Sequence, residues 1–285
     1  MAESDVVVNA PGFWVHRGAA LTMTSAHQHD DLELNLVTRG HLEYLFGGRA
    51  LSVPAGSIAM FWAATPHRLM HRQDDAEVAE GCWLHVPLAT VRGWALPQDS
   101  LARLLRDRPL IVDAAPLGDL ADSFDRWATD LTSRETTEIA LMEVQALAMR
   151  ILLAARHSAS GGQGARRQER STMPDAVAGM AGYIAINFRD PVRVADVAAA
   201  VHLHPSTAMQ VFRTSLGMTL GDYLTRCRVA EAQRLLITTS RPAGDIGIAA
   251  GFGTVSAFYE AFRRATGSPP AAYRRSRSAG EAPPP

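Results

Sequence analysis

The segment HQHDDLE (residues 27–33) contains two histidines and a glutamate whose side chains can bind a divalent metal ion. His27, His29 and Glu33 all occupy odd positions, so on one extended strand they lie on the same face. Imidazole nitrogens combined with a carboxylate suit iron, manganese, zinc or nickel. The same side chains could instead line a pocket for an organic ligand, or satisfy one another in a polar core. The residue types and their spacing do not decide among these three uses.

A later group of residues extends this pattern. Gly48, Pro54 and Gly56 have the spacing GxxxxxPxG, and His67 follows in the turn ATPH. The combination resembles the two motifs of the cupin barrels, in which two histidines, a glutamate and a later histidine can hold a metal. The chain departs from that pattern at Ala59, where the second motif usually has its histidine. We therefore expect no metal and no other cofactor. Any metal that did bind would use His27, His29, Glu33 and His67.

Aromatic side chains in the same region are candidates for holding an organic effector. Trp62 and Trp83 can stack on the apolar face of a sugar ring, and Trp94, Phe13 and Trp14 lie in the same half of the chain. Tryptophan is, however, found in hydrophobic cores more often than in pockets. The expected effector site consists of His27, His29, Glu33, Trp62, His67 and Trp83.

Short antiparallel strands are expected to position these side chains, from Ala26 to about Pro97. The leucines at positions 32, 34 and 36 alternate with other residues, which is the period of a strand with two distinct faces. Gly47-Gly48 separates HLEYLF from RALSV and suits a two-residue hairpin turn. The turns PAGS and ATPH enclose the apolar run SIAMFW. Strands of this length, separated by glycine and proline, predict a small cupin-like β-barrel or jelly roll.

Helices follow the strands, from Leu117 to His157. An apolar stripe at a spacing of three to four residues predicts a helix of several turns that packs on the barrel or on a second subunit. The stripe consists of Leu141, Val144, Ala148, Ile151 and Ala155. Residues 1–157 are therefore expected to form one domain that senses an effector and can dimerise.

The composition changes sharply at residues 158–172, which are rich in Gly, Ser, Gln and Arg and are expected to form a flexible linker. Residues 173–275 are expected to form an all-α DNA-binding domain, and residues 276–285 a disordered tail. The chain is thus an α+β multidomain protein. From Met173 onward, 12 arginines accompany 8 acidic residues, whereas the preceding part has 16 arginines and 21 acidic residues. A cationic C-terminal part is typical of a DNA-binding module.

Two helix-turn-helix units in tandem are predicted within this domain. The first spans Val192–Gly217 and the second Arg241–Gly267, and the helix predicted at residues 219–238 joins them. Such a pair can reach two successive major-groove segments about 34 Å apart. The side chains expected to face DNA are Ser206, Thr207, Met209, Gln210, Arg213, Thr254, Ser256, Tyr259, Arg263 and Arg264. Gln and Arg can pair with adenine and guanine edges, although Arg213 could equally contact a phosphate.

The C-terminal residues resemble the AraC/XylS family of transcriptional regulators. The resemblance rests on TLGDYLTRCRVAEAQRLL and GFGTVSAFYEAFRRATGSPPAAYRR, and it extends over most of the chain toward a branch that responds to sugars. It implies seven helices in this domain, two reader helices in adjacent major grooves, RNA polymerase as a partner and a role as activator. The chain departs from the family at VHLHP, where Gly-Leu-Ser-Pro is usual, which puts the strength of that helix cap in question.

The expected protein is a cytoplasmic regulator of carbohydrate-utilisation genes, gated by a small molecule, and not an enzyme. The first ten residues have acidic side chains and no apolar segment, so we expect no secretory signal. Cys82 and Cys227 form no CxxC motif and are expected to be free thiols. The expected partners are double-stranded DNA, an effector and a second copy of the chain, with no membrane. The alternative is a metal-dependent cupin enzyme or a metal sensor fused to a DNA-binding domain.

Overall fold

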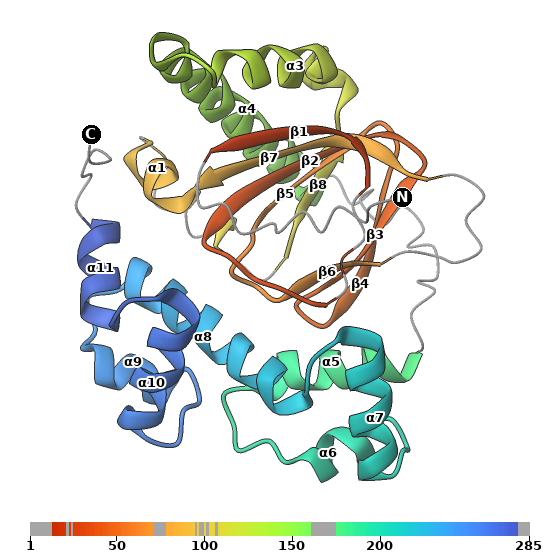
Figure 1. Ribbon diagram of the computed structural model, residues 1–285, viewed down its shortest axis with the longest axis vertical. Helices are drawn as coiled ribbons and strands as arrows, with labels where there is room; N and C mark the ends of the chain where they lie inside the picture. Colours follow the sequence, from red (N-terminus) through yellow and green to blue (C-terminus); the bar gives the residue numbers. More distant parts are fainter. Residues whose placement is uncertain are drawn as a thin grey trace.

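The N-terminal half of the chain contains two antiparallel sheets (Figure 1). The computed structural model describes residues 13–20, 23, 25–70, 78–94, 96, 100, 103–105, 108–160 and 175–278. The first sheet has five strands in the order β1-β7-β2-β5-β8, and the second has three in the order β4-β3-β6. The strands are β1 (Trp14–Ala19), β2 (Asp31–Arg39), β3 (His41–Phe46), β4 (Arg49–Pro54), β5 (Ser57–Trp62), β6 (His67–Met70), β7 (Glu80–Pro87) and β8 (Leu110–Asp113).

Strand β2 shows how the sequence divides the large sheet into two faces. Leu32, Leu34 and Leu36 point to one side and join a hydrophobic core, whereas Glu33 and Asn35 point to the other. The hairpin between β3 and β4 turns at Gly47 and Gly48, whose φ angles of 51° and 78° match the turn predicted from the sequence. The polar face of β2 is thereby directed toward the smaller sheet (Figure 1).

Helices cover the apolar face of the five-stranded sheet. Helices α3 (Leu120–Asp130) and α4 (Arg134–Ser160) lie over it in Figure 1, and α1 (Leu88–Gly93) follows β7. Val144 and Ile151 of the predicted stripe are buried in the same core as the β2 leucines. Of the two alternatives for this stripe, packing against the barrel is therefore the one found.

Seven helices make up residues 175–278, as the family resemblance implied. They are α5 (Asp175–Asn187), α6 (Val194–Ala199), α7 (Pro205–Leu216), α8 (Leu220–Thr238), α9 (Ala243–Ala249), α10 (Val255–Thr266) and α11 (Pro270–Ser278). The helices form two hydrophobic cores, one around Phe212 and one around Phe258. Helix α8 contributes Tyr223 and Cys227 to the first core and Leu235 and Leu236 to the second, so both units share it.

Some elements differ from the sequence expectation. Strands β1 and β8 lie outside the predicted strand region, and residues 88–93 within it form α1. Helix α4 continues to Ser160 and α11 to Ser278, a few residues into the segments expected to be linker and tail. Residues 161–172 and 279–285 lie outside the described residues. Within the described part of the chain, no helix has the length and apolar character needed to span a membrane.

Candidate functional site

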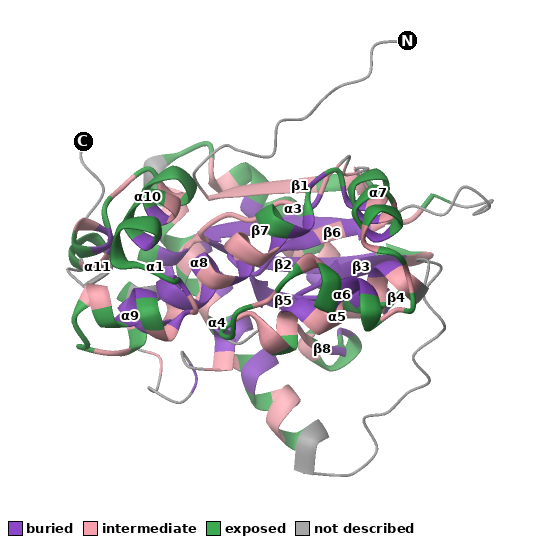
Figure 2. Cartoon of the chain, turned by 90° about the horizontal axis from the view of Figure 1, so that it is seen from below, coloured by how far each residue is buried: buried purple, intermediate pink, exposed green. Residues whose placement is uncertain are grey.

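The first reader helix, α7, presents a polar face to solvent. Its buried side chains, Ala208, Phe212 and Leu216, recur at the spacing of one helical face. The predicted DNA-facing side chains of this helix lie on the opposite face and are exposed, as the green parts of α7 in Figure 2 illustrate; they are Ser206, Thr207, Met209, Gln210 and Arg213. The face is therefore free to enter a groove.

Both ends of α7 are defined by local contacts. His204 is the N-cap, and its Nδ1 accepts a hydrogen bond from the Ser206 amide at 3.4 Å. Pro205 follows at the first helical position, where a missing amide costs nothing. Gly217 ends the helix in the left-handed conformation, with φ of 70°. The unusual VHLHP turn thus still caps its helix, with an imidazole in place of a hydroxyl.

The turn before α7 contains a strained residue. Among the described residues other than glycine, His202 is the one with positive φ, at 57°. A β-carbon in this conformation costs about 1–2 kcal/mol, and glycine avoids that cost.

We expect His202→Gly to raise the free energy of unfolding by about 0.5–1 kcal/mol, the relief of strain less the extra freedom of glycine in the unfolded chain. Urea denaturation of the purified protein measures this. His202→Ala is the control, since it keeps the β-carbon and should give no gain. A loss of stability in His202→Gly would show that the exposed imidazole makes a contact worth more than the strain.

The second reader helix, α10, has the same organisation but fewer free polar groups. Thr254 Oγ1 caps the helix by accepting a hydrogen bond from the Ala257 amide at 3.1 Å. Phe258 and Phe262 are buried. The exposed face contains Thr254, Ser256, Tyr259, Arg263 and Arg264. The Arg264 guanidinium donates to the Glu260 carboxylate one turn earlier, so Thr254 and Arg264 already have partners within the chain.

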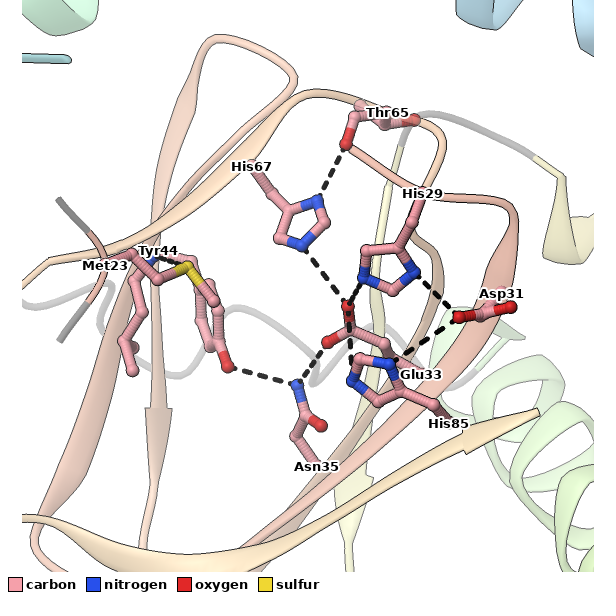
Figure 3. A network of polar contacts seen from close by, with 10 residues as sticks. Met23, His29, Asp31, Glu33, Asn35, Tyr44, Thr65, His67 and His85 are labelled. Carbon is pink, nitrogen blue, oxygen red and sulfur yellow. Dashed lines mark hydrogen bonds and ion pairs between the residues drawn. The ribbon is translucent and has the colours of Figure 1, made fainter. Parts of the chain in front are cut away.

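A second group of polar residues lies between the two sheets (Figure 3). We call His27, His29, Asp31, Glu33, His67 and His85 the polar cluster. Glu33 lies on β2 and His85 directly opposite it on β7. His67 begins β6 and pairs through its backbone with His27, so His27 and His29 lie in the segment that precedes β2 rather than on that strand. Three separate parts of the chain therefore meet at one carboxylate.

The Glu33 carboxylate is the centre of the polar cluster. Its Oε1 lies 2.7 Å from His29 Nε2, 3.2 Å from His67 Nε2 and 3.6 Å from His85 Nε2. Asp31 Oδ2 accepts a hydrogen bond from His29 Nδ1 at 3.0 Å and lies 3.7 Å from His85 Nδ1. Glu33 and His67 are almost completely buried. The cluster thus shields two carboxylates from water and surrounds them with imidazoles.

The pKa shifts follow from this arrangement. Burial favours the neutral form of Glu33, but His85 and His67 and the contacts from His29 hold its pKa well below the ordinary value. Burial also opposes the charged form of His29, yet Asp31 and Glu33 raise its pKa to about 9. Burial and the neighbouring His67 lower the pKa of His27 to about 3. At neutral pH the cluster therefore contains ionised Glu33, protonated His29 and neutral His27.

The two tryptophans proposed for an effector site lie apart from each other. Trp83 is on the same face of the large sheet as Glu33, opposite Asn35, and its ring lies 5.7 Å from that of His16. Trp62 pairs with Leu32, so it points into the apolar core on the other face, and its Nε1 donates to Asp30 Oδ1 at 3.2 Å. His27, His29, Glu33 and His67 thus lie together on one side of the large sheet. Trp62 lies on the other side of the sheet.

The sequence reasoning missed Asp31 and His85 of the polar cluster, and Asn35, which donates to Glu33. Asp31 and Asn35 share the parity of Glu33 on one strand, so alternation could have identified them. His85 lies far along the chain, and no local pattern marks it. Its place opposite Glu33 depends on the pairing of β2 with β7.

Comparisons with known proteins cover both domains. A family model described as an AraC-like ligand binding domain matches residues 15–154, and one described as a helix-turn-helix domain matches residues 197–276. Over 259 residues the chain is 27% identical to the "Melibiose operon regulatory protein" of Escherichia coli (strain K12), which covers 89% of this chain and 84% of that protein. Over 93 residues it is 32% identical to the "Bifunctional transcriptional activator/DNA repair enzyme AdaA" of Bacillus subtilis (strain 168), which covers 33% and 44%.

Solved structures resemble the C-terminal domain or nearly the whole chain. The DNA-binding domain of AdpA in complex with a target DNA is 30% identical, with a TM-score of 0.35, and covers 36% of this chain and 93% of that one. Apo ToxT from Vibrio cholerae is 14% identical, with a TM-score of 0.37, and covers 94% and 98%.

Proposed function

This chain belongs to the AraC family of DNA-binding transcriptional regulators, and we propose that it activates carbohydrate-utilisation genes in the cytoplasm when a sugar binds its N-terminal domain. The family is the one expected from the sequence. The observation that supports DNA reading most directly is the pair of exposed polar faces on α7 and α10, held in register by α8. The sugar is suggested by the similarity to a protein named for the melibiose operon.

We propose that the DNA contacts are unequal between the two units. In α7, Ser206, Thr207, Met209, Gln210 and Arg213 offer donors, acceptors and an apolar group for base edges. In α10, Arg263 is suited to phosphate, whereas Thr254 and Arg264 are engaged within the chain. Most sequence discrimination is therefore assigned to α7, with Ser256, Tyr259 and the arginines of α10 chiefly positioning the protein.

We expect Gln210→Ala to relax base preference at one position of the bound site and to cost about 1–3 kcal/mol on the preferred sequence. The reason is that an exposed glutamine amide can make two hydrogen bonds, to N6 and N7, at the major-groove edge of adenine, which alanine cannot. Selection of duplexes from a random library, followed by affinity measurement, checks this. Arg263→Ala is the comparison and should weaken all sequences alike, with a salt slope lower by about one. Equal losses on every sequence for Gln210→Ala would make it a positioning contact.

The effector proposal is tested with the full-length protein and a panel of sugars. A sugar that binds the folded state raises the apparent melting temperature, and one that gates the protein also changes its affinity for DNA. If no sugar changes either quantity, the sugar proposal fails while DNA binding stands. We propose that the effector contacts come from His27, His29, Glu33, His67 and Trp83 between the sheets. Trp62, which was also expected there, is buried in the apolar core on the other face of the sheet and does not belong to this group.

We further propose that the protein dimerises through α4 and recruits RNA polymerase once bound to DNA. Apolar side chains on the outer face of α4 remain exposed although the inner face is packed on the sheet: Ile139 is 50% exposed, Met142 62% and Leu153 55%. Residues 142 and 153 lie about three turns apart on one face of the helix. A face of this kind suits a second copy of the same helix.

We expect Met142→Glu to weaken self-association at least about tenfold, since it places a charge within an apolar contact. Sedimentation equilibrium measures the dissociation constant. Ile186→Glu is the matched control, because Ile186 is 73% exposed on a different helix. If both variants weaken association equally, or neither does, α4 is not the interface.

A further inference from the structure

We propose that His27, His29, Glu33 and His67 bind a divalent transition-metal ion. We also propose that residues 26–30, which contact both helix-turn-helix units, couple metal binding to DNA affinity. The inference assigns a metal ion to four of the side chains that are also proposed above as effector contacts. It rests on the proposed function only because the effect of the metal is measured as a change in DNA affinity.

The first support is the set of donor atoms that converge inside the barrel. One donor atom from each of the four side chains lies within 4.8 Å of all the others. The buried atoms that lack a hydrogen-bond partner include His27 Nε2, His29 Nε2, Glu33 Oε1 and His67 Nε2. His29 and His67 reach Glu33 at ion-pair distance, but without the alignment of a hydrogen bond. Polar atoms buried in this way are costly unless something binds them, and a cation satisfies all four together.

The second support is that the outer atoms of three of these side chains, those of His29, Glu33 and His67, are already held. His67 Nδ1 donates to the Thr65 carbonyl at 2.9 Å, and His29 Nδ1 donates to Asp31 at 3.0 Å. Asn35 Nδ2 donates to Glu33 Oε2 at 3.2 Å. An imidazole whose Nδ1 is fixed to an acceptor directs its Nε2 at a fixed point, which is how proteins orient metal-binding histidines. Figure 3 shows the inner atoms of His29, Glu33 and His67 directed toward one another.

The donor types narrow the choice of ion. Three imidazoles and one carboxylate suit zinc, nickel, manganese or iron, and they do not suit the all-oxygen preference of calcium and magnesium. Glu33 Oε1 is surrounded by the imidazoles of His29, His67 and His85. The four proposed ligand atoms lie within 4.8 Å of one another, close enough for one ion to bind them together.

The third support concerns residues 26–30, which carry His27 and His29 between two anchors on the DNA-binding domain. At one end, the Ala26 amide donates to the carbonyl of Leu216, the last residue of reader helix α7, at 3.1 Å. The Ala26 carbonyl accepts from Arg226 of α8 at 3.3 Å. At the other end, Asp30 Oδ2 accepts from the Tyr273 hydroxyl of α11 at 2.9 Å. One short segment therefore touches both helix-turn-helix units.

The two anchors give the site a way to affect DNA binding. A metal that draws His27 and His29 toward Glu33 and His67 fixes the backbone between Ala26 and Asp30. The first anchor belongs to the first unit and the second anchor to the second unit, so the occupied site favours one relative placement of α7 and α11. A ligand shifts such an equilibrium only by its preference for one arrangement, so the effect appears as a difference in DNA affinity.

The experiment uses the full-length protein, stripped with a chelator and then dialysed against zinc, nickel, manganese or, without oxygen, ferrous iron. Metal analysis should find about one ion per chain, and the melting temperature should rise with the bound ion. His27→Ala should lower metal affinity by more than tenfold. His41→Ala is the matched control, because His41 faces Glu43 rather than Glu33, and it should bind metal normally. No stoichiometric metal in the wild type, or equal losses in both variants, would overturn the site.

The coupling is tested with Tyr273→Phe, which removes the hydroxyl that donates to Asp30 and keeps the ring in its core. The wild type should bind a selected duplex with an affinity that changes several-fold between stripped and metal-loaded protein. Tyr273→Phe should bind the same amount of metal but lose most of that change. An unchanged response in Tyr273→Phe, or no response in the wild type, would overturn the coupling. Failure to bind any duplex would instead refute the proposed function, and the metal analysis would still decide the site.

Discussion

Replacing Phe258 by alanine should lower the free energy of unfolding of the second helix-turn-helix unit by about 3–5 kcal/mol. The ring is completely buried in the core that α8, α9, α10 and α11 share. It packs directly on the backbone of α9: a β-carbon added at Gly247 would lie 2.5 Å from the ring. Because position 247 has no side chain, nothing there can fill the cavity that alanine leaves.

The first unit should survive this change. Its core, around Phe212, is a separate cluster, and the N-terminal half of α8 belongs to it. Phe258→Ala should therefore shorten the region of DNA that the protein protects from nuclease, with the part read by α7 retained. Circular dichroism during urea denaturation should show an earlier separate transition.

Tyr259→Ala is the matched control for this prediction. Tyr259 is the neighbouring aromatic residue, and it is 39% exposed on the reader face. Its replacement should leave stability within about 0.5 kcal/mol and weaken DNA binding. If Phe258→Ala unfolds in a single cooperative transition and loses nuclease protection over both halves of the DNA site, the two units fold as one.

Gly48→Ala should destabilise the protein by about 2–5 kcal/mol and loosen the contact between the two domains. Gly48 has φ of 78°, where a side chain costs about 1–2 kcal/mol. A β-carbon there would also lie 2.3 Å from the Ala181 carbonyl oxygen of α5. Because that obstacle is backbone, the hairpin or the helix has to move, at a further cost of about 1–3 kcal/mol.

Gly56→Ala separates strain in the turn from the clash between domains. Gly56 has φ of 79° in the next turn, and a β-carbon there would meet nothing within 4 Å. It should therefore cost only about 1–2 kcal/mol. Thermal unfolding compares the two variants, and limited proteolysis between the domains reports their contact. If both variants lose the same amount of stability, the packing of the barrel against α5 does not contribute to the stability of the protein.

The C-terminal domain could be predicted closely because its signals are local. Side chains three or four residues apart share one face of a helix, so the apolar spacing around Phe212 and Phe258 identifies the inner side and leaves Gln210 and Tyr259 outside. Thr254 and Gly217 then mark where helices begin and end through contacts within one turn. A sequence contains this information within a few residues.

The alternation of β2 and the Gly47-Gly48 turn were equally local, and they determined that Glu33 lies on the face opposite the leucines. What lies across from Glu33 depended on strand order. Pairing of β2 with β7 brings His85 to Glu33, and pairing with β5 turns Trp62 away from it. A strand's own residues do not specify which strand pairs with it, since every backbone offers the same hydrogen bonds.

The sequence by itself therefore determined the two helices expected to read DNA, their polar faces and the set of histidines and carboxylates that could meet in a site. The tertiary structure decided which of those residues meet, and that the segment carrying His27 and His29 is bonded to Leu216 and Tyr273. Those contacts join residues separated by about two hundred positions, and they depend on how completed sheets and helices pack. Periodicity within one element defines its faces, whereas the packing of elements defines what each face touches.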